Sequence, residues 1–357
     1  MKISILPARS LAPDLVAAWR SIQAADPALS SPFLCPEFTA AVAQSRADTE
    51  VAVFEDGGVP VGFFPYQRFG RSRGRPVGEW MNDFQAVVAT PGLDWNCAQL
   101  MRACRLDHWE FERLLDTQAQ FVPSHARRSR TAFMDVSQGY ERYVANRRRA
   151  GTRIFPRVEQ LARKAVHEVG PLRFEAQSAD VSAMEKLMQW KFERYAARGY
   201  DDIFSVAWAR ELLERVHARR ENKFAGMLSL LYVGDELAAG VVGIRSHTHW
   251  HAWHPAYNPR LAPYSPGLIL LLQMARHAPE VGVERIELGG PEDYAYKQRL
   301  MSCSIGVAGG TVDRLAIVGA ARRLRHFGES WVRASPAIAP VVRGVVRALR
   351  KAREGVA

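Results

Sequence analysis

Cysteine is scarce in this chain, and the residues present are too irregularly spaced for a disulfide framework or a zinc motif. The four cysteines include no Cys-x-x-Cys pair among 357 residues: Cys35, Cys97, Cys104 and Cys303. Disulfide-stapled secreted domains and zinc ribbons need regularly paired cysteines. We therefore expect free, mostly buried thiols in a protein of the reducing cytoplasm.

Long apolar runs are also missing. No stretch approaches the roughly 18 to 20 consecutive apolar residues of a transmembrane helix. The first residues, MKISILPARS, contain one lysine and a short strand-like run, without the apolar core and cleavage site of a secretory signal. With 48% hydrophobic and 24% charged residues, the composition is that of a globular protein. We expect a cytoplasmic location.

Two enzyme fingerprints are absent. The chain contains no G-x-G-x-x-G dinucleotide motif and no G-x-S-x-G nucleophile elbow. These absences weigh against an oxidoreductase and against a hydrolase of the elbow type. Nucleic-acid-binding fingerprints are missing as well.

Positive charge is abundant, with a formal net charge of +11. It gathers in residues 127–164, which include Arg147, Arg148 and Arg149, and in residues 322–353. Basic runs attract nucleic acid, anionic membrane surfaces or phosphorylated substrates, and they also serve as plain solvated helix faces. We do not expect nucleic acid as a partner. Peripheral contact of the basic tail with the inner face of a membrane stays open.

A chain of this length is expected to form about two domains. The second half predicts a fixed order of elements: strand 172–176, helices 182–198 (opened by the capping box Ser182-x-x-Glu185) and 206–219, strands 227–233, 237–246 and 248–257, helix 266–280, strand 284–288, helix 291–300 and strand 304–312.

The first half predicts a similar order: strand 2–6, helices 13–24 and 36–45, strands 50–55, 59–67 and 80–89, helix 94–105, and strands 108–114 and 130–135. The hairpin FEDGGVPVGFF of the first half matches YVGDELAAGVV of the second, with Gly62 and Gly240 in equivalent places. We interpret the chain as a tandem duplication of one mixed α/β unit. An Arg-rich helix, interrupted at Pro156, joins the halves.

The segment Trp250–Lys297 predicts an anion site at a helix start. Ser265 is a favourable N-cap and Pro266 suits the first helical position, since its missing N–H would be unpaired there. Free N–H groups and the macrodipole at such a start attract a phosphate. The alternative is an ordinary capped helix with no ligand.

The element order, together with four sequence blocks, resembles the tandem GNAT N-acetyltransferases. The blocks are NRRRAGTRIFPRVEQLARK, VGDELAAGVVG, SPGLILLLQMARHAPEVGVERIELG and EDYAYKQRL. The likeness covers about residues 1–315 and is strongest in the second half. It points to the group associated with cellulose and exopolysaccharide biosynthesis, and to its relatives, the Fem-type aminoacyl transferases of peptidoglycan.

The resemblance implies acyl transfer from acetyl-CoA to an amine or hydroxyl. In GNAT proteins the strand before the cofactor helix binds the pantetheine, and the loop into that helix binds the pyrophosphate. It implies no metal. The loop here, PRLAPYSPG, has one glycine and three prolines, fewer glycines than usual. The implied cofactor-binding residues are Trp253, Ala256, Arg260, Tyr264, Ser265, Gly267 and Leu268.

The resemblance also places proton donors after the last core strand of the second unit. Tyr296 is our first candidate to protonate the leaving sulfur, and Tyr294 is the second. Lys297 would stabilise negative charge or bind an anionic substrate. Packing in the core and on the surface is the competing interpretation for these residues. Glu292 and Asp293 would contact the acceptor or act through a water, or else simply favour a helix start.

Histidines and tryptophans crowd the strand 248–257. His247, His249 and His251 alternate, as zinc ligands on one face could, but no carboxylate or cysteine stands at ligand spacing beside them. A general base, His254 or His251, is the more natural role. Trp250 is a candidate to line the acceptor site, with a core position as the alternative.

One helix face predicts an acceptor site. Lys191, Arg194 and Arg198 recur at helical spacing on helix 182–198, where GNAT proteins build part of their acceptor site. This face would meet an anionic or sugar-phosphate acceptor. A solvated charged face is the alternative.

We therefore expect a mixed α/β protein of two GNAT-like units: a degenerate unit at 1–137, a basic linker helix at 138–170, the acyltransferase unit at 171–315 and a basic helical tail at 316–357. The expected activity is direct acyl transfer to a sugar or a surface-polysaccharide precursor. Two alternatives remain. One is a Fem-like transferase that uses aminoacyl-tRNA, and the other is a catalytically silent GNAT-fold protein of a biosynthetic complex.

Overall fold

The computed structural model describes residues 1–197, 199, 204–290 and 294–314. Its N-terminal half contains the following elements: β1 (Lys2–Pro7), α1 (Pro13–Ala25), α2 (Pro36–Ser45), β2 (Thr49–Asp56), β3 (Val59–Phe69), β4 (Arg73–Arg75), β5 (Val88–Ala89), α3 (Cys97–Ala103), β6 (His108–Leu115) and β7 (His125–Asp135).

Two helices, α4 (Tyr140–Arg149) and α5 (Ile154–Glu168), lead into the C-terminal half. That half contains β8 (Leu172–Glu175), α6 (Val181–Ala196), α7 (Ala207–His217), β9 (Arg220–Glu221), β10 (Phe224–Val233), β11 (Glu236–Ser246), β12 (His249–Tyr257), α8 (Pro266–His277), β13 (Arg285–Glu287), α9 (Ala295–Leu300) and β14 (Cys303–Asp313). The mixed α/β fold expected from the sequence is confirmed.

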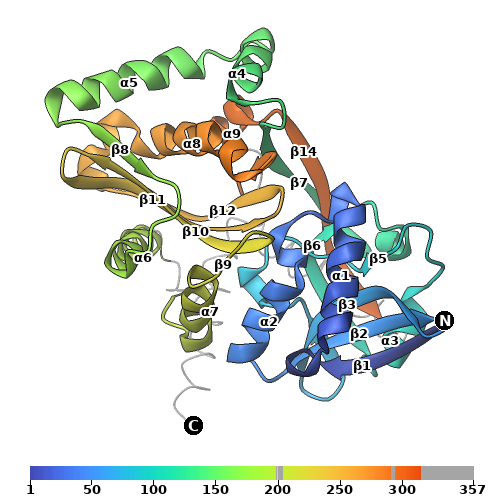
Figure 1. Cartoon of the computed structure of the whole chain (residues 1–357). Coiled ribbons are helices and arrows are strands. Elements are labelled where there is room, and N and C mark those ends of the chain that lie inside the picture. Colours follow the sequence, from blue (N-terminus) through green and yellow to red (C-terminus); the bar gives the residue numbers. More distant parts are fainter. Residues whose placement is uncertain (198, 200–203, 291–293, 315–357) are drawn as a thin grey trace, which may run out of the picture.

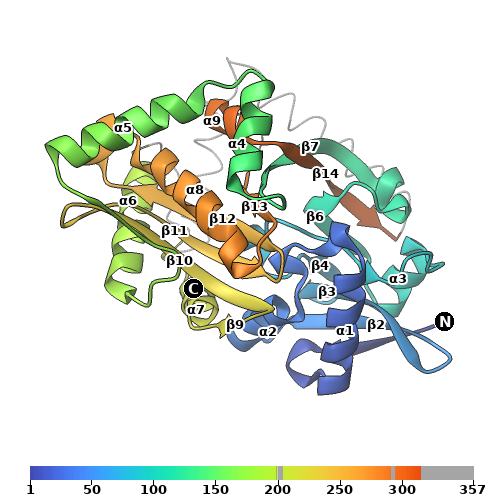
Figure 2. The same cartoon turned by 45° about the horizontal axis from the view of Figure 1, so that its top comes forward.

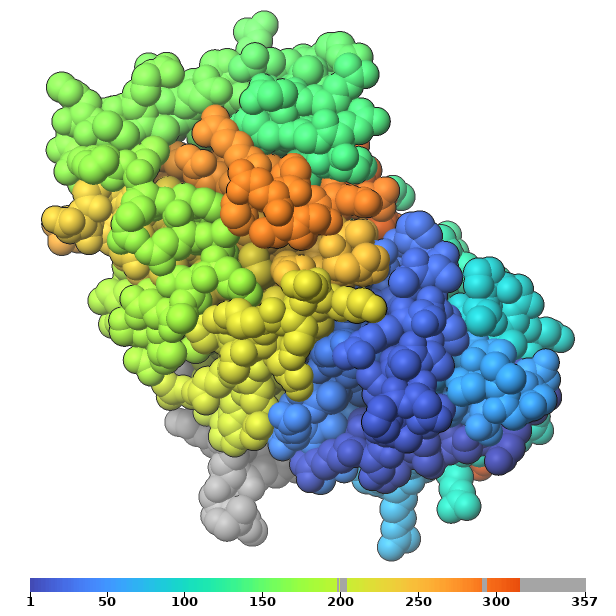
Figure 3. All heavy atoms as spheres, in the orientation of Figure 1, coloured from blue at the N-terminus to red at the C-terminus, as the bar shows by residue number. Residues whose placement is uncertain are grey.

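The described strands join into one sheet that runs through both halves. Along its main path the strand order is β1-β2-β3-β4-β6-β14-β7-β13-β12-β11-β10-β8. In Figure 1 the N-terminal half lies on one side of the molecule and the C-terminal half on the other, and Figure 3 shows them in contact side by side.

The last strand of each half crosses to the other. β14 lies between β6 and β7, and β7 lies between β14 and β13. Residues 304–312 thus complete the sheet of the first half rather than pairing with β13. The unit boundaries at 137 and 171 remain predictions, but the sheet itself is shared.

Helices cover both faces of the sheet in the C-terminal half. α5 and α8 pack over one face, and α6 and α7 pack over the other (Figures 1 and 2). Gly240 of β11 permits the close approach of α6, because a Cβ at this position would clash with the Leu187 side chain. An apolar core lies on each of these two faces.

The predicted strand 80–89 is largely wrong. Outside the short β5 no regular ladder forms: Gln85 makes a single parallel bridge to Leu114, and neighbouring backbone amides bond to side chains. The Asn82 side chain accepts from the Phe84 amide at 2.8 Å, and the Gln118 side chain accepts from the Val87 amide at 2.9 Å. Side chains that bond the backbone locally compete with a regular ladder. Residues 82–87 therefore form an ordered loop that faces the C-terminal half.

Two predicted helix features are also corrected. The N-cap of α6 is Asp180, whose carboxylate accepts from the Ala183 amide at 3.1 Å, so Ser182 and Glu185 form no capping box there. The Arg-rich linker breaks at Gly151, which has a φ of +86°, rather than at Pro156. Pro156 sits in the first turn of α5, where its missing N–H costs no helical hydrogen bond.

Candidate functional site

The site begins where two central strands separate. β12 pairs in parallel with β13 through His249–His251, matched to Arg285–Glu287. Beyond His251 this edge of β12 has no strand partner among the described residues. A β-bulge lies at the same place, since the three-residue step from His251 to His254 on β12 faces the two-residue step from Ile244 to Val242 on β11. A bulge redirects side chains, and here both histidines lie on the α6 side of the sheet.

A cavity of about 290 Å³ opens between the free part of β12, the start of α8 and α9. Its walls are mainly apolar, from residues such as Val241, Ala252, Leu271 and Leu288. An apolar cavity with a few polar groups is typical of a small-molecule site. It brings together several residues singled out from the sequence: Arg194, Ala256, Ser265, Gly267, Leu268 and Tyr296.

The mouth of this cavity is the first turn of α8. Ser265 adopts a left-handed conformation (φ +53°) and its side chain forms no cap, so the predicted N-cap hydrogen bond is wrong. Its carbonyl instead accepts from the Leu268 amide at 3.0 Å. Within the described residues the Gly267 amide has no acceptor, so it can bind an anion at the helix start.

Tyr296 and its neighbours occupy different environments. Tyr296 lines the cavity, and burial raises the pKa of its phenol to about 12. Tyr294 is 54% exposed. Lys297 is buried and donates to the Gly289 carbonyl, with its ammonium 5.2 Å from the centre of the Tyr294 ring. Of the three, Tyr296 is the side chain at the cavity wall.

A charged cluster spans the two halves next to the strand separation. This interface cluster consists of Asp83 and Arg113 from the N-terminal half and His251 and Glu287 from the C-terminal half. His251 lies 3.0 Å from Asp83 (Nε2 to Oδ2) and 2.9 Å from Glu287 (Nδ1 to Oε2). Arg113 donates to the Asp83 carbonyl at 2.8 Å. His251 and Glu287 are completely buried.

The charges of the interface cluster stabilise one another. Burial alone would lower the pKa of His251, but Glu287 and Asp83 outweigh it and raise the pKa to about 9. Burial likewise opposes ionisation of Asp83, yet His251 and Arg113 hold the pKa of its carboxyl well below its usual range. The raised pKa favours the imidazolium form of His251 and so weighs against a role as base there.

A second polar pair lies nearby. Lys191 Nζ of α6 is 3.2 Å from His254 Nδ1. Burial lowers the pKa of Lys191 to about 8, and burial together with the Lys191 charge lowers the pKa of His254 well below its usual value. A protonated Lys191 donates to Nδ1, which leaves the hydrogen of His254 on Nε2. This atom is buried and has no partner in the described residues.

Other predicted residues lie apart from the cavity. Trp250 is fully buried on the α8 face, and Trp253 packs against Phe33 on the opposite face. Arg260 is exposed at 3.9 Å from Glu236, and Tyr264 donates to Glu168. Glu292, Asp293, Arg198 and the tail 316–357 lie outside the described residues.

Sequence reasoning missed Asp83, Arg113 and Glu287. Glu287 carried only a weak signal, because it stands between Ile286 and Leu288 in a short predicted strand, where a buried acid needs a partner. Asp83 and Arg113 carried none, since their roles depend on contacts with the other half.

Activated thiols and metal clusters are not found in the described residues. No group of three or more histidines, cysteines and carboxylates is placed there to hold a metal ion. Burial raises the pKa of Cys97 and of Cys104 to about 12, and it also raises the pKa of Cys35 and Cys303. Such thiols are poor nucleophiles. No described helix has the length and apolar character needed to cross a bilayer.

Sequence comparison addresses the C-terminal half directly. Residues 157–298 match the model of the acetyltransferase (GNAT) domain family. The matched GNAT segment includes β12, the cavity mouth and most of α9. Among curated proteins, no sequence matches the chain.

Solved structures with the same GNAT-like fold extend over nearly the whole chain. FemX superposes with a TM-score of 0.58 at 9% identity, covering 90% of this chain and 99% of FemX. A tandem GNAT protein from the clavulanic acid biosynthesis pathway gives 0.50 at 13% identity, covering 88% and 98%. An Agrobacterium fabrum domain that bears the name of lysylphosphatidylglycerol synthetase gives 0.51 at 13%, covering 87% and 94%. The chain therefore has a GNAT-like acyltransferase fold, and the tandem arrangement agrees with these neighbours.

Proposed function

We propose that this protein transfers an acetyl or other acyl group from acyl-CoA to an amine or hydroxyl of a sugar or surface-polysaccharide precursor. The observation that carries the proposal is the apolar cavity at the strand separation, with the Gly267 amide at its mouth and Tyr296 on its wall. The cavity suits an apolar thioester arm, and the helix start suits the phosphates.

Direct transfer follows from the residues around the cavity. The acceptor nitrogen or oxygen attacks the thioester carbonyl, the acyl–sulfur bond breaks, and the thiolate leaves. Tyr296 donates a hydrogen bond to the departing sulfur. Because its pKa is about 12, its phenol stabilises the thiolate by hydrogen bonding rather than by full proton transfer. The buried thiols are not activated, so no acyl-enzyme is required.

The acceptor is proposed to bind on the α6 side. Asp83 keeps a quarter of its side chain exposed and carries a stable negative charge. A cationic amine would bind to it. Lys191 and His254 lie in the same region, and an unprotonated Lys191 would accept the proton that the amine must lose.

This role of Lys191 predicts a pH profile. Wild-type kcat/KM for acyl transfer should rise with pH and level off above about pH 8, because Lys191 becomes a base as it deprotonates. Lys191→Arg, which stays protonated, should remove the part of this rise that is due to Lys191 and leave only the titration of the acceptor amine. The measurement is thiol release from acetyl-CoA with an amino sugar at a series of pH values.

Lys186→Arg is the matched control, since Lys186 is exposed on the same helix. The pH profile of Lys186→Arg includes the titration of the acceptor amine, as the wild-type profile does, and the two profiles should be equal. A profile for Lys191→Arg that coincides with the control would refute the base role.

Calorimetry tests the proposed function most directly. The purified protein should bind acetyl-CoA and free CoA with dissociation constants in the micromolar range, roughly 1 to 100 μM. If neither binds at about 1 mM, the acyl-CoA proposal fails, and a catalytically silent GNAT-fold protein becomes the better interpretation.

Gly267→Ala separates ligand binding from folding. A Cβ at this position would meet Tyr257 at 4.0 Å and would otherwise face open space at the cavity mouth. Alanine in a helix is favoured over glycine by up to about 1 kcal/mol, so the melting temperature should hold or rise. Affinity for acetyl-CoA should fall about tenfold, because the methyl group keeps the phosphates from the backbone. Unchanged affinity would place the phosphates elsewhere.

A second function, transfer from aminoacyl-tRNA, is supported by the likeness to FemX and by the exposed arginines of α4. Binding of aminoacyl-tRNA would then fall steeply with salt. A competition assay decides between the two donors, because tRNA should displace acetyl-CoA only if both occupy the same cavity.

A further inference from the structure

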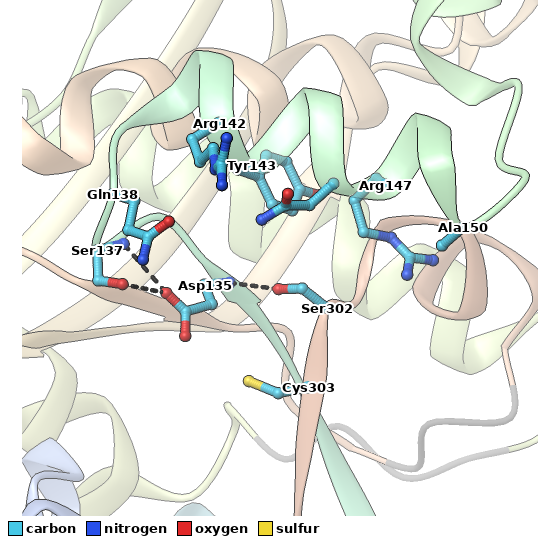
Figure 4. Close-up of a pocket in the computed structure, with 10 residues that line it drawn as sticks. Asp135, Ser137, Gln138, Arg142, Tyr143, Arg147, Ala150, Ser302 and Cys303 are labelled. Atoms are coloured by element: carbon cyan, nitrogen blue, oxygen red, sulfur yellow. Dashed lines mark hydrogen bonds between the residues drawn. The ribbon is translucent and has the colours of Figure 1, made fainter.

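A second cavity, of about 350 Å³, shares no lining residue with the acyl cavity. It is bounded by α4 and by the ends of β7 and β14 (Figure 4). We name it the helix-4 pocket. The polar residues that matter for its chemistry are Asp135, Ser137, Arg142, Asn146, Arg147 and Ser302.

Asp135, the carboxylate of the helix-4 pocket, is already hydrogen-bonded and paired with an arginine. One oxygen accepts from the Ser137 hydroxyl at 2.6 Å and from the Ser137 amide at 3.1 Å, and the other lies 3.6 Å from Arg285. The Ser302 hydroxyl accepts from the Asp135 amide at 2.7 Å and keeps its own hydrogen for a ligand. Arg285 and Ser137 therefore offset part of the repulsion between the carboxylate and an anion.

The arginines of the pocket retain donor capacity. Arg142 is exposed and pairs with no group in the part of the chain that the structure describes. Arg147 uses two of its nitrogens on the carbonyls of Gln298 and Arg299. Figure 4 shows both side chains on α4, near the ends of β7 and β14. Arg148 and Arg149 follow on the same helix and raise the local positive potential.

The wall of the pocket is held in place by α9. The Tyr143 hydroxyl donates to the Leu300 carbonyl at 2.6 Å, and Arg147 donates to the Gln298 carbonyl at 3.0 Å. A positively charged side chain at the end of a helix also interacts favourably with its dipole. The position of α4 is thereby fixed before any ligand arrives, which lowers the entropy cost of binding.

We propose that the helix-4 pocket binds a phosphate group, held by Arg142 together with Arg147, Asn146 and the Ser302 hydroxyl. Guanidinium groups match the geometry of phosphate oxygens, and the surrounding hydroxyl and amide groups donate to the remaining ones. The volume admits more than the phosphate itself, so a small phosphorylated molecule or the headgroup of a phospholipid fits. This binding does not depend on acyl transfer.

The test is direct binding in the absence of acyl-CoA. We expect inorganic phosphate to bind the full-length protein at low salt with a dissociation constant of about 1 mM or below, measured by calorimetry. Arg142→Gln should weaken binding at least about tenfold. Its melting temperature in phosphate-free buffer should equal that of the wild type, because Arg142 makes no described contact.

Arg148→Gln is the matched control, with the same loss of charge on an exposed residue of α4 outside the pocket. Binding that this variant retains and Arg142→Gln loses supports the proposal. Vesicles of phosphatidylglycerol, compared with phosphatidylcholine, distinguish a lipid headgroup from a soluble source. Equal losses in both variants, or no binding of phosphate or vesicles, would overturn the proposal.

Discussion

Replacing Tyr296 with phenylalanine should lower kcat for acyl transfer about a hundredfold, the usual effect of removing one hydrogen-bond donor that acts in the transition state. The substitution removes a hydroxyl from a residue on the cavity wall and leaves its ring in the apolar packing around α9. Affinity for acetyl-CoA should stay within about twofold, because the lost hydrogen bond forms with the departing sulfur rather than with the bound thioester. Thiol release and calorimetry measure the two quantities separately.

Tyr294→Phe provides the comparison. Tyr294 is two residues away and exposed, so the same loss of a hydroxyl there should leave kcat nearly unchanged. If Tyr294→Phe were the slow variant and Tyr296→Phe the normal one, the order of the two candidates would be reversed. If both variants retained full activity, neither phenol would take part in the reaction.

Replacing Glu287 with glutamine should destabilise the protein by about 3 kcal/mol near neutral pH, at the low end of the cost of breaking a buried ion pair by removing one partner. Glu287 is completely buried 2.9 Å from His251, so glutamine keeps the volume and loses the charge. His251 would then retain one carboxylate, Asp83, for its positive charge. Denaturant unfolding measures the change in free energy.

The loss should depend on pH in a defined direction. The pKa of His251 is raised from 6.5 to about 9, so its contribution to stability is fully present below about pH 6.5 and disappears as the pH rises through 9. The difference between wild type and Glu287→Gln should therefore be largest near pH 6 and shrink toward pH 10. Comparing the two proteins at each pH cancels the titration of all groups that they share.

Glu284→Gln controls for a change of charge alone, because Glu284 is exposed three residues earlier in the chain. It should shift the free energy of unfolding by less than about 0.5 kcal/mol. A deficit in Glu287→Gln that is the same at all pH values would mean that His251 is not charged in the folded protein.

Local patterns were sufficient for most of the individual elements. The hairpin around Gly234 and the apolar stripe of α8 follow from residues that are neighbours in sequence, and the structure has both. Even so, the start of α8 differs in detail, because Ser265 takes a left-handed conformation that no nearby residue signals.

The sequence also carried part of the site. The resemblance to GNAT proteins predicts roles for Gly267 and Tyr296, and both line the same cavity. Arg194 of α6 joins them there and stacks over Tyr257, with its guanidinium carbon 4.3 Å from the ring centre. These residues come together because of the order of strands and helices along the chain, which the sequence predicts.

Tertiary structure alone decided how the halves are joined. β7 pairs with β13 of the C-terminal half, and β14 pairs with β7 of the N-terminal half. Strands pair through backbone N–H and C=O groups, which are the same for nearly all residues, so the sequence does not show which strands are neighbours. The loop at Asp83 lies against His251 through a contact 168 residues apart in the chain. Hydrophobic periodicity reports which face of an element is buried, but not which element covers it. The sequence by itself determined the mixed α/β order of elements and the cavity-forming strand and helix. Packing between the halves determined the charged cluster, since its partners become neighbours only when the chain is folded.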